Sequence, residues 1–221
     1  MSKTLNPSAA LDVPPARSVP RLLSAAGIAA GPLFLAAGLA QGLTRDGFDF
    51  TRNALSQLSL GALGWIQVTV FLLTGLLVIA GATAIRQALR DAPGSTWAPR
   101  LLYAFGASFL LAGVFPADPG AGFPAGASED RVTSLSAHGI VHMLSGTVGY
   151  LALCAAFLVL ARHFASLRQR GWTLAARFTP VGVLAGFAAS ATTVVAFTAG
   201  AGLGLLALSA VTARLTYPAR Q

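Results

Sequence analysis

Residues 22–43 read LLSAAGIAAGPLFLAAGLAQGL, a run of 22 positions without a charged side chain. A helix needs about 20 apolar residues to cross the hydrocarbon core of a bilayer, so this run predicts a membrane-spanning helix. A cleaved signal peptide is the alternative, because small residues occupy positions 38 and 40. The run exceeds the roughly 7–15 residues of a signal-peptide core, which favours a helix that is retained.

Apolar runs of similar length recur along the rest of the chain. We expect spans at about 22–43, 64–85, 97–115, 138–160, 180–199 and 205–217, the last two separated at Gly200, Gly202 and Gly204. A single helix across 180–217 would be too long for one crossing. The predicted fold class is therefore all-α, a polytopic membrane bundle with six transmembrane helices in residues 22–217.

The composition agrees with this class. The 221 residues are 55% hydrophobic and 10% charged, with a mean hydropathy of +0.69, whereas soluble domains carry roughly 25% charged residues. The net charge of +8 could suggest nucleic acid, but the basic residues are scattered in short segments between apolar runs. This scatter argues against a nucleic-acid partner and leaves the lipid bilayer as the expected one. The sequence identifies no protein partner.

The distribution of positive charge predicts the orientation. Twelve of the 15 basic residues lie in 1–21, in 86–100, in 161–179 or near the C-terminus, and the exceptions are Arg45, Arg52 and Arg131. The positive-inside rule then places both termini in the cytoplasm. We expect residues 1–21 to form a disordered cytoplasmic tail, 161–179 a basic connector, and 218–221 a cytoplasmic end. The loops at 44–63 and 116–137 then face outward.

The most polar segment between two apolar runs ends with a pair of histidines. It contains FPADPGAGFPAG (115–126) and HGIVH (138–142). His138 and His142 are four residues apart, so both point to one face of a helix. Neutral imidazoles suit zinc, and Asp118 in the preceding turn is the candidate third ligand. The same three residues are the candidates for acid–base catalysis.

Structural interpretations of these residues stay open. The histidines could hydrogen-bond to loop backbone and lipid headgroups, and Asp118 could cap its own turn. Haem ligation is less well supported, because a haem needs its two histidines on different helices or opposite faces. A serine such as Ser56 combined with histidine and aspartate suggests hydrolysis, although no GxSxG elbow is present.

The first polar loop and the start of the second span supply four candidate binding residues. Ser56 could line the same outer pocket as the histidines. Asp46 and Asp49 add acidic charge on the face where most carboxylates lie. Trp65 begins the second span, where an indole suits the depth of lipid headgroups.

Three GxxxG pairs, Gly27/Gly31, Gly38/Gly42 and Gly182/Gly186, lie in apolar runs. Such pairs let helices approach closely. We expect them to serve helix packing inside the chain rather than a dimer interface.

The motifs NALSQLSLGALGWIQ (53–67), FPADPGAGFPAG and SAHGIVH resemble the actinobacterial branch of the Domain of Unknown Function 998 family, from about residue 21 to 217. The matching positions are Trp65, Phe115, Asp118, Pro119, Gly122, Pro124, Gly126, His138, Gly139 and His142. The resemblance implies a six-helix protein of the bacterial cytoplasmic membrane and implies no activity. Relatives often carry an acid at the position of Gln57, so an acidic site there would be altered in this chain.

Three functions are compatible with these observations. The first is a lipid- or partner-binding membrane protein with an outward-facing polar cap, because no complete catalytic constellation is present. The second is an outward-facing, metal-dependent hydrolase or lipid-modifying enzyme that uses Asp118, His138 and His142. The third is a small-molecule carrier, which requires a cavity that reaches the middle of the membrane.

Overall fold

The computed structural model describes residues 18–130 and 134–217, and it folds them into six long helices. The elements are α1 (Ser18–Thr44), the short 3-10 helix η1 (Leu55–Ser59), α2 (Gly64–Ala88), α3 (Trp97–Val114), α4 (Ala137–Ser166), α5 (Arg170–Ala189) and α6 (Val194–Thr216). Five of the helices, all except α5, are long and apolar enough to cross a membrane. The chain is thus an all-helical, multi-pass membrane protein.

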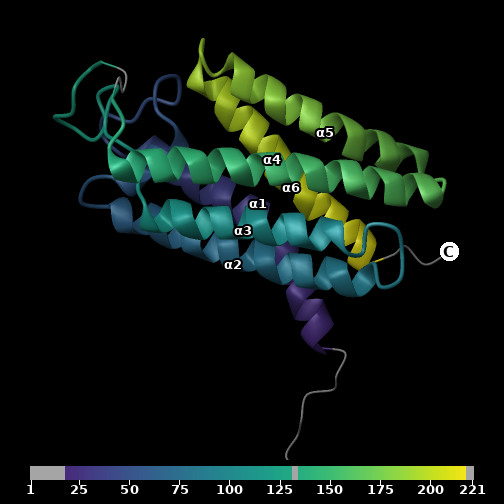
Figure 1. The fold of residues 1–221 in the computed structure, drawn as a ribbon. Helices are drawn as coiled ribbons and strands as arrows, with labels where there is room; N and C mark the ends of the chain where they lie inside the picture. Colours follow the sequence, from purple (N-terminus) through teal and green to yellow (C-terminus); the bar gives the residue numbers. More distant parts are fainter. Residues whose placement is uncertain (1–17, 131–133, 218–221) are drawn as a thin grey trace, which may run out of the picture.

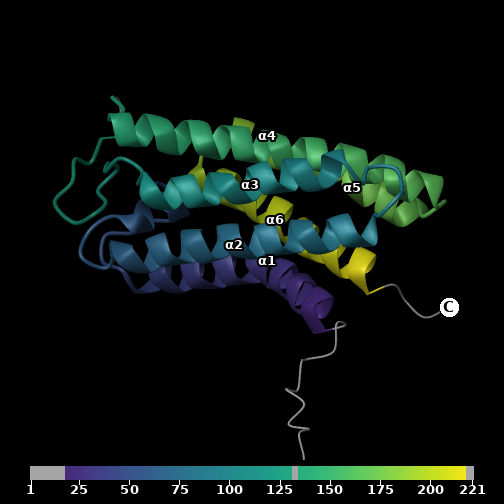
Figure 2. The ribbon, with the colours of Figure 1, turned by 60° about the horizontal axis from the view of Figure 1, so that its bottom comes forward.

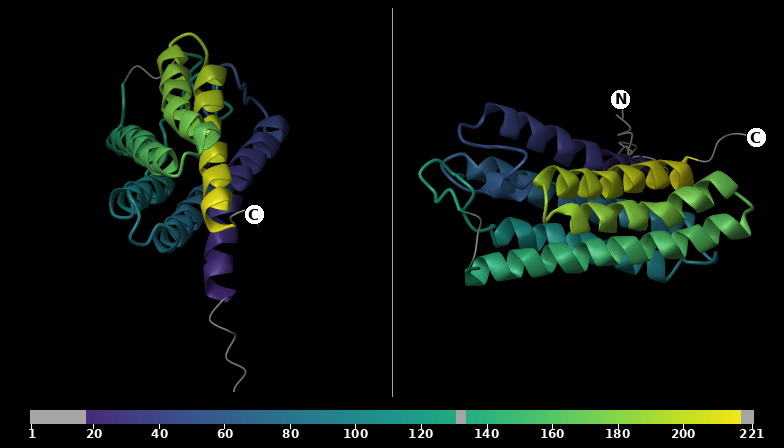
Figure 3. Two further views of the ribbon diagram at one scale, coloured as in Figure 1. Left: turned by 90° about the vertical axis from the view of Figure 1, so that its right-hand side faces the viewer. Right: turned by 90° about the horizontal axis from the view of Figure 1, so that it is seen from above.

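The six helices form a ring in chain order. Each helix packs against the one before it, and α6 returns to pack against α1 (Figure 1, Figure 3). The two polar loops and the α5–α6 turn lie at one end of the bundle, which we call the cap end. The short links α2–α3 and α4–α5 lie at the other end, which we call the basic end (Figure 2).

The GxxxG pairs pack inside the chain, as predicted. A Cβ atom at Gly27 would come 2.5 Å from the Gly81 Cα on α2, and one at Gly186 would come 2.7 Å from the Gly200 Cα on α6. Both distances are far below van der Waals contact, so only glycine allows these backbones to meet. At Gly38 a Cβ would meet the Leu55 side chain instead. These glycines therefore bring α1 against α2 and η1, and α5 against α6.

The break between the last two helices differs from the prediction. It lies at residues 190–193, and the three glycines at 200, 202 and 204 are inside α6. Thr193 begins α6, where its hydroxyl accepts a hydrogen bond from the Val195 amide. Gly200 packs on α5, and a Cβ at Gly204 would come 2.9 Å from the Leu153 side chain on α4. The glycines are there for close packing, and the break is set by a threonine cap.

The predicted connector at 161–179 is also helical. α4 continues to Ser166, only residues 167–169 link the helices, and α5 begins at Arg170. The positive φ of Arg168 (56°) makes this turn tight. Arg162, Arg170 and Arg177 are therefore exposed on the two helices, and Arg168 is exposed in the short link.

The predicted N-terminal boundary is shifted too. α1 begins at Ser18, within the segment predicted as a tail, and residues 1–17 and 218–221 lie outside the described residues. By contrast, α2 and α3 begin at the predicted residues, and α4 begins one residue earlier than predicted.

Candidate functional site

The two polar loops pack into a single cap, and Arg45 joins them. Its guanidinium donates hydrogen bonds to the carbonyls of Leu58 (2.5 Å) and Leu60 (2.6 Å). The same group lies 4.9 Å from the centre of the Phe123 ring in the second loop. Leu58 and Phe123 are fully buried. A residue expected on the polar surface thus closes the first loop and stacks on the second.

Asn53 and Gln57 connect the loops through backbone carbonyls. The Asn53 amide donates to Ala121 O at 3.2 Å, and the Gln57 amide donates to Gly120 O at 3.2 Å. Gln57 Oε1 accepts from the Ala54 backbone amide at 3.1 Å. Position 57 therefore needs both a donor and an acceptor, which a glutamine supplies and a glutamate does not.

Asp118 attaches the second loop to the start of α4. Its carboxylate accepts hydrogen bonds from the Ser136 amide (2.9 Å) and the Ser136 hydroxyl (2.5 Å). Ser136 in turn caps the helix by accepting from the Gly139 amide at 3.0 Å. The carboxylate thus lies at the positive end of the α4 dipole. Gly139 is required there, because a Cβ would overlap the carboxylate.

The two histidines have different surroundings although they share a helix face. His138 is exposed, and its ring lies edge-on to Phe115 with centroids 5.6 Å apart. His142 is 6% exposed, and its Nδ1 lies 2.8 Å from the Phe115 carbonyl. The His142 imidazole on α4 therefore forms a hydrogen bond with the end of α3.

The zinc hypothesis finds no ligand set in the described part of the chain. No group of three His, Cys, Asp or Glu side chains in residues 18–130 and 134–217 is arranged to hold a metal ion. Asp118 is bonded to Ser136, and the two histidines contact Phe115 in separate ways. Asp118, His138 and His142 thus each form a separate contact in the cap and do not converge on one point.

The other candidate residues of the first loop are separated. Asp46 and Asp49 are exposed on the cap, and Trp65 is 64% exposed on its rim. Hydrogen bonds from the hydroxyl and amide of Thr51 hold the pKa of the Asp49 carboxyl below its usual value. Ser56 differs from these three, because it lines a cavity beneath the cap.

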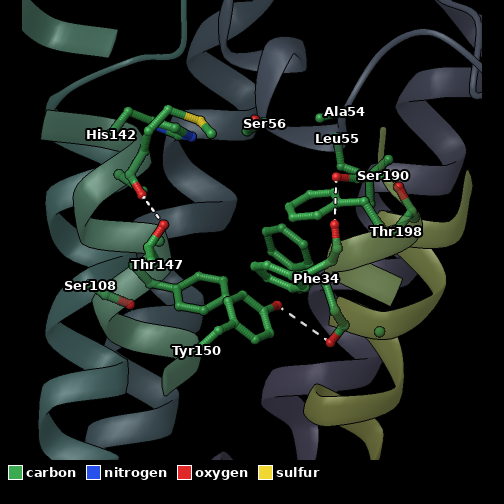
Figure 4. Close-up of a pocket in the computed structure, with 18 of the residues that line it drawn as sticks. Phe34, Ala54, Leu55, Ser56, Ser108, His142, Thr147, Tyr150, Ser190 and Thr198 are labelled. Carbon is green, nitrogen blue, oxygen red and sulfur yellow. Dashed lines mark hydrogen bonds between the residues drawn. The ribbon is translucent and has the colours of Figure 1, made fainter. Parts of the chain in front are cut away.

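That cavity lies inside the helix ring. It has a volume of about 340 Å³ and is lined by residues from all six helices, with η1 as its roof. Figure 4 shows His142 and Ser56 near the roof and Tyr150 deeper, where its hydroxyl bonds to the Ala201 carbonyl at 3.4 Å. Tyr150 lies near the middle of α4, so the cavity extends from the cap to about half the helix length.

The cavity is mostly apolar, and none of the described residues that line it is charged. Edge-to-face and tilted aromatic pairs form much of its wall, with Phe34 packed on Phe109 at 5.2 Å and Tyr150 on Phe187 at 5.0 Å. The polar side chains in the wall are neutral hydroxyls and the His142 imidazole. About 300–1,000 Å³ is the usual size of a small-molecule site, and such sites are mostly apolar with a few polar groups.

One side of the cavity is open between α4 and the α5–α6 turn. Met143 and Thr147 line the cavity and are nevertheless exposed, Met143 to 55%. A Cβ at Gly146 would meet nothing within 4 Å. Near this opening the α5–α6 hairpin diverges from α4 (Figure 1, Figure 3). The opening faces sideways, in the direction in which the helices present apolar side chains.

Sequence reasoning found two lining residues, His142 and Ser56, and missed the rest. Phe34, Phe109 and Tyr150 belong to apolar runs in which a cavity wall and a packed core have the same composition. The available signal was the set of small polar residues within the runs, such as Thr147 and Thr198, because hydroxyls in a membrane helix often face protein or a cavity.

A second hollow lies at the basic end between α2 and α3. It has a volume of about 460 Å³ and is lined by Arg86, Arg90 and Arg100 together with the acidic Asp91 and uncharged residues. The three guanidiniums are exposed and form no ion pair within the described residues. This hollow is open and polar, which suits contact with water and headgroups rather than an apolar ligand.

A family model described as "Protein of unknown function (DUF998)" matches residues 28–216. No curated protein and no solved structure matches the chain. The family match runs from the first turns of α1 to the last residue of α6, so it includes both polar loops and every helix that lines the cavity. The chain therefore belongs to the DUF998 family of proteins of unknown function.

Proposed function

We propose that this protein binds the hydrocarbon part of a lipid or lipid-like molecule in the cavity beneath the cap. The observation that carries the proposal is an aromatic-walled cavity of about 340 Å³ whose lining residues Met143 and Thr147 are exposed on the flank of α4. A water-soluble ligand would approach from the cap, but Leu55 of the roof is buried there. A molecule dissolved in the bilayer can enter through the side.

The aromatic wall supports a hydrocarbon chain as the occupant. Burying an alkyl chain stabilises a complex by roughly 0.8 kcal/mol per CH₂ relative to water. A hydrocarbon chain that comes from the bilayer gains none of this free energy, because it is already out of water. Dispersion contacts with the rings of Phe34, Phe109 and Phe187 must therefore favour the cavity over the bilayer. Rigid rings contact a chain at little entropic cost, which favours this kind of wall.

The proposal includes six crossings with both termini in the cytoplasm. α5 has 20 residues, long enough at about 1.5 Å per residue to cover a hydrocarbon core of roughly 30 Å. Its exposed face carries Leu174, Phe178, Val181 and Leu184. Arg170 and Arg177 lie in its first turns, near the other arginines of the basic end. This clustering supports the cytoplasmic placement of that end, which leaves the cap and the cavity mouth in the outer half of the bilayer.

The test uses a dodecyl methyl ether that carries a diazirine in its chain, added to the full chain in lipid nanodiscs. After illumination, mass spectrometry of the digested protein should find the label on α4 and α6 at the cavity wall. Gly146→Phe fills the open space at the mouth and should reduce this labelling at least tenfold without loss of thermal stability. Gly171→Phe is the matched control, because Gly171 also has nothing within 4 Å of its Cβ position but lies at the basic end.

Two results would contradict lipid binding in the cavity. One is labelling confined to the outward faces of the helices in the wild-type protein. The other is equal labelling of the cavity wall in the wild type and in Gly146→Phe.

A carrier is the second candidate, because the cavity reaches the middle of α4. In the structure the basic half below Tyr150 is filled by buried side chains, among them Leu153, Phe157 and Leu205. Carrying a ligand across would therefore require the contact between Tyr150 and the Ala201 carbonyl to open. Proteoliposomes loaded with a fluorescent dodecyl ether test this: transbilayer movement at the rate of protein-free vesicles would rule out the carrier and leave binding intact.

A further inference from the structure

The hydrogens of most polar side chains in the cavity wall are already used. Ser108 donates to Phe105 O at 2.7 Å, Thr147 donates to Met143 O at 2.8 Å, and both bonds stay within one helix. A hydroxyl has one hydrogen and two lone pairs. Once its hydrogen is bonded to a carbonyl of its own helix, the hydroxyl offers only an acceptor to the cavity.

The same holds where α5 and α6 face α4. Ser190 donates to the Phe187 carbonyl at 2.6 Å, and Tyr150 donates to the Ala201 carbonyl at 3.4 Å. Figure 4 shows both hydroxyls on the cavity wall with these bonds drawn. Within the described residues, the Thr198 hydroxyl and the Ser56 hydroxyl in the roof form no hydrogen bond and are free to donate or accept.

The imidazole of His142 adds a nitrogen acceptor near the roof. Carbonyl groups at the end of α3, Phe115 at 2.8 Å and Ala112 nearby, lie against the ring. Carbonyls only accept, and a neutral imidazole has one N–H, so this hydrogen is directed at α3. The other ring nitrogen is then an acceptor, and His142 is 94% buried and lines the cavity.

We infer that the cavity selects an uncharged lipid-like molecule whose polar end donates a hydrogen bond, and a long-chain alcohol is the simplest such ligand. This inference rests on the proposed function and names the ligand class of the same cavity. Among the described wall residues, five side chains offer acceptors, and only Ser56 and Thr198 have a hydroxyl hydrogen left to donate. A hydroxyl on the ligand supplies the hydrogen that these acceptors lack.

The absence of charge in the wall excludes an ionised headgroup from the interior. No Asp, Glu, Lys or Arg of residues 18–130 and 134–217 lines the cavity. An ion in an apolar interior without a partner is strongly unfavourable. The arginines that could pair with a phosphate or carboxylate lie at the basic end, around the separate hollow between α2 and α3. A charged headgroup could therefore only remain outside, at the cavity mouth.

The experiment measures competition against the diazirine-labelled dodecyl methyl ether in nanodiscs that contain the full chain. The competitors are 1-dodecanol, unlabelled dodecyl methyl ether and dodecanoate at pH 8. The alcohol and the ether have nearly the same shape, and only the alcohol donates a hydrogen bond. We expect 1-dodecanol to compete at a concentration roughly fivefold lower than the ether, as one net hydrogen bond allows, and dodecanoate to compete more weakly than either.

His142→Asn removes the acceptor at the second ring nitrogen and keeps a hydrogen bond to the Phe115 carbonyl. The asparagine amide group can take the place of Nδ1 and donate toward the Phe115 carbonyl, but no atom replaces the second ring nitrogen. The preference for alcohol over ether should fall to within twofold in this variant, with the labelling by the ether unchanged. His163→Asn is the control, because His163 is a buried histidine of the same helix outside the cavity. If His142→Asn does not fold, Thr147→Val removes a different acceptor with little change of shape and should reduce the preference.

The outcomes separate this inference from the proposed function. If the ether labels the cavity but the alcohol has no advantage, or dodecanoate competes best, the inference is wrong and lipid binding stands. If the ether does not label the cavity at all, the proposed function is wrong as well. An alcohol preference that survives both His142→Asn and Thr147→Val would also overturn the inference, since the selection would then arise elsewhere.

Discussion

Replacement of Gly139 by alanine should have opposite effects on stability with and without the Asp118 carboxylate. A Cβ at Gly139 would overlap the nearer carboxylate oxygen and lie 2.6 Å from the carboxylate carbon. The three nearest atoms all belong to Asp118, so this one side chain makes the position a glycine. The overlap can be relieved only if the carboxylate moves away from α4.

The magnitude follows from the bonds that this movement breaks. Asp118 would lose its hydrogen bonds to the Ser136 amide and hydroxyl, at 2.9 and 2.5 Å. Loss of a helix N-terminal capping interaction costs about 0.5–2 kcal/mol, and overpacking costs roughly 1–3 kcal/mol. We expect Gly139→Ala to lower the free energy of unfolding by roughly 1–3 kcal/mol. In the Asp118→Ala background the obstacle is gone, and alanine should stabilise the helix by up to about 1 kcal/mol.

Thermal unfolding followed by circular dichroism at 222 nm in detergent measures the four proteins of this cycle. Each kcal/mol corresponds to roughly 2–4 °C in Tm for a chain of this size. A change of sign between the two backgrounds would support the contact. An effect of Gly139→Ala that is equal in both backgrounds would refute it, because Asp118 would then not lie over the first turn of α4.

Three further predictions concern the cap, each measured by thermal unfolding of the purified protein. Gln57→Glu should lower the free energy of unfolding by roughly 1–3 kcal/mol, because a carboxylate oxygen would face the Gly120 carbonyl without a hydrogen between them; an unchanged Tm would mean that this bond does not form. Arg45→Lys should cost about 1–2 kcal/mol, since an ammonium cannot bond two carbonyls and stack on Phe123 at once; a neutral result would contradict the bidentate contact. Arg52→Ala should change stability by less than about 0.5 kcal/mol, because its ion pair is exposed, and a larger loss would show that this pair anchors the second loop.

The sequence predicted the starts of α2, α3 and α4 because apolar runs there end in turns and polar residues. It placed the last break wrongly because glycine has two roles that look alike in a sequence. In the interior of a soluble helix, a glycine lowers the stability of the helix, and the sequence around Gly200 was interpreted in this way. Between membrane helices it allows close packing, and the partner that decides this, Gly186, is far away in the sequence. Only the tertiary arrangement distinguishes the two roles.

The polar motif at 115–142 correctly indicated residues that build the cap, but it did not distinguish metal ligands from structural contacts. Its Asp118 and His142 were candidates both for a metal site and for structural hydrogen bonds, because acids and imidazoles suit either role. The structure shows a hydrogen bond for each, one at the start of α4 and one at the end of α3. The choice between these roles depends on whether other ligands converge, and no spacing within one segment can establish that.

His142 connects the cap to the cavity, which explains why a residue can be structural and functional together. One ring nitrogen is bonded toward α3, and this bond fixes the ring so that the other side of the imidazole faces the cavity. The same order holds for Thr147 and Ser190, whose bonds to their own helices orient their lone pairs inward. Hydrogen bonds that satisfy a membrane helix internally therefore set the polarity of the cavity: they consume donors and leave acceptors. A ligand that brings its own hydrogen completes the arrangement, whereas one that brings only acceptors depends on the two free hydroxyls.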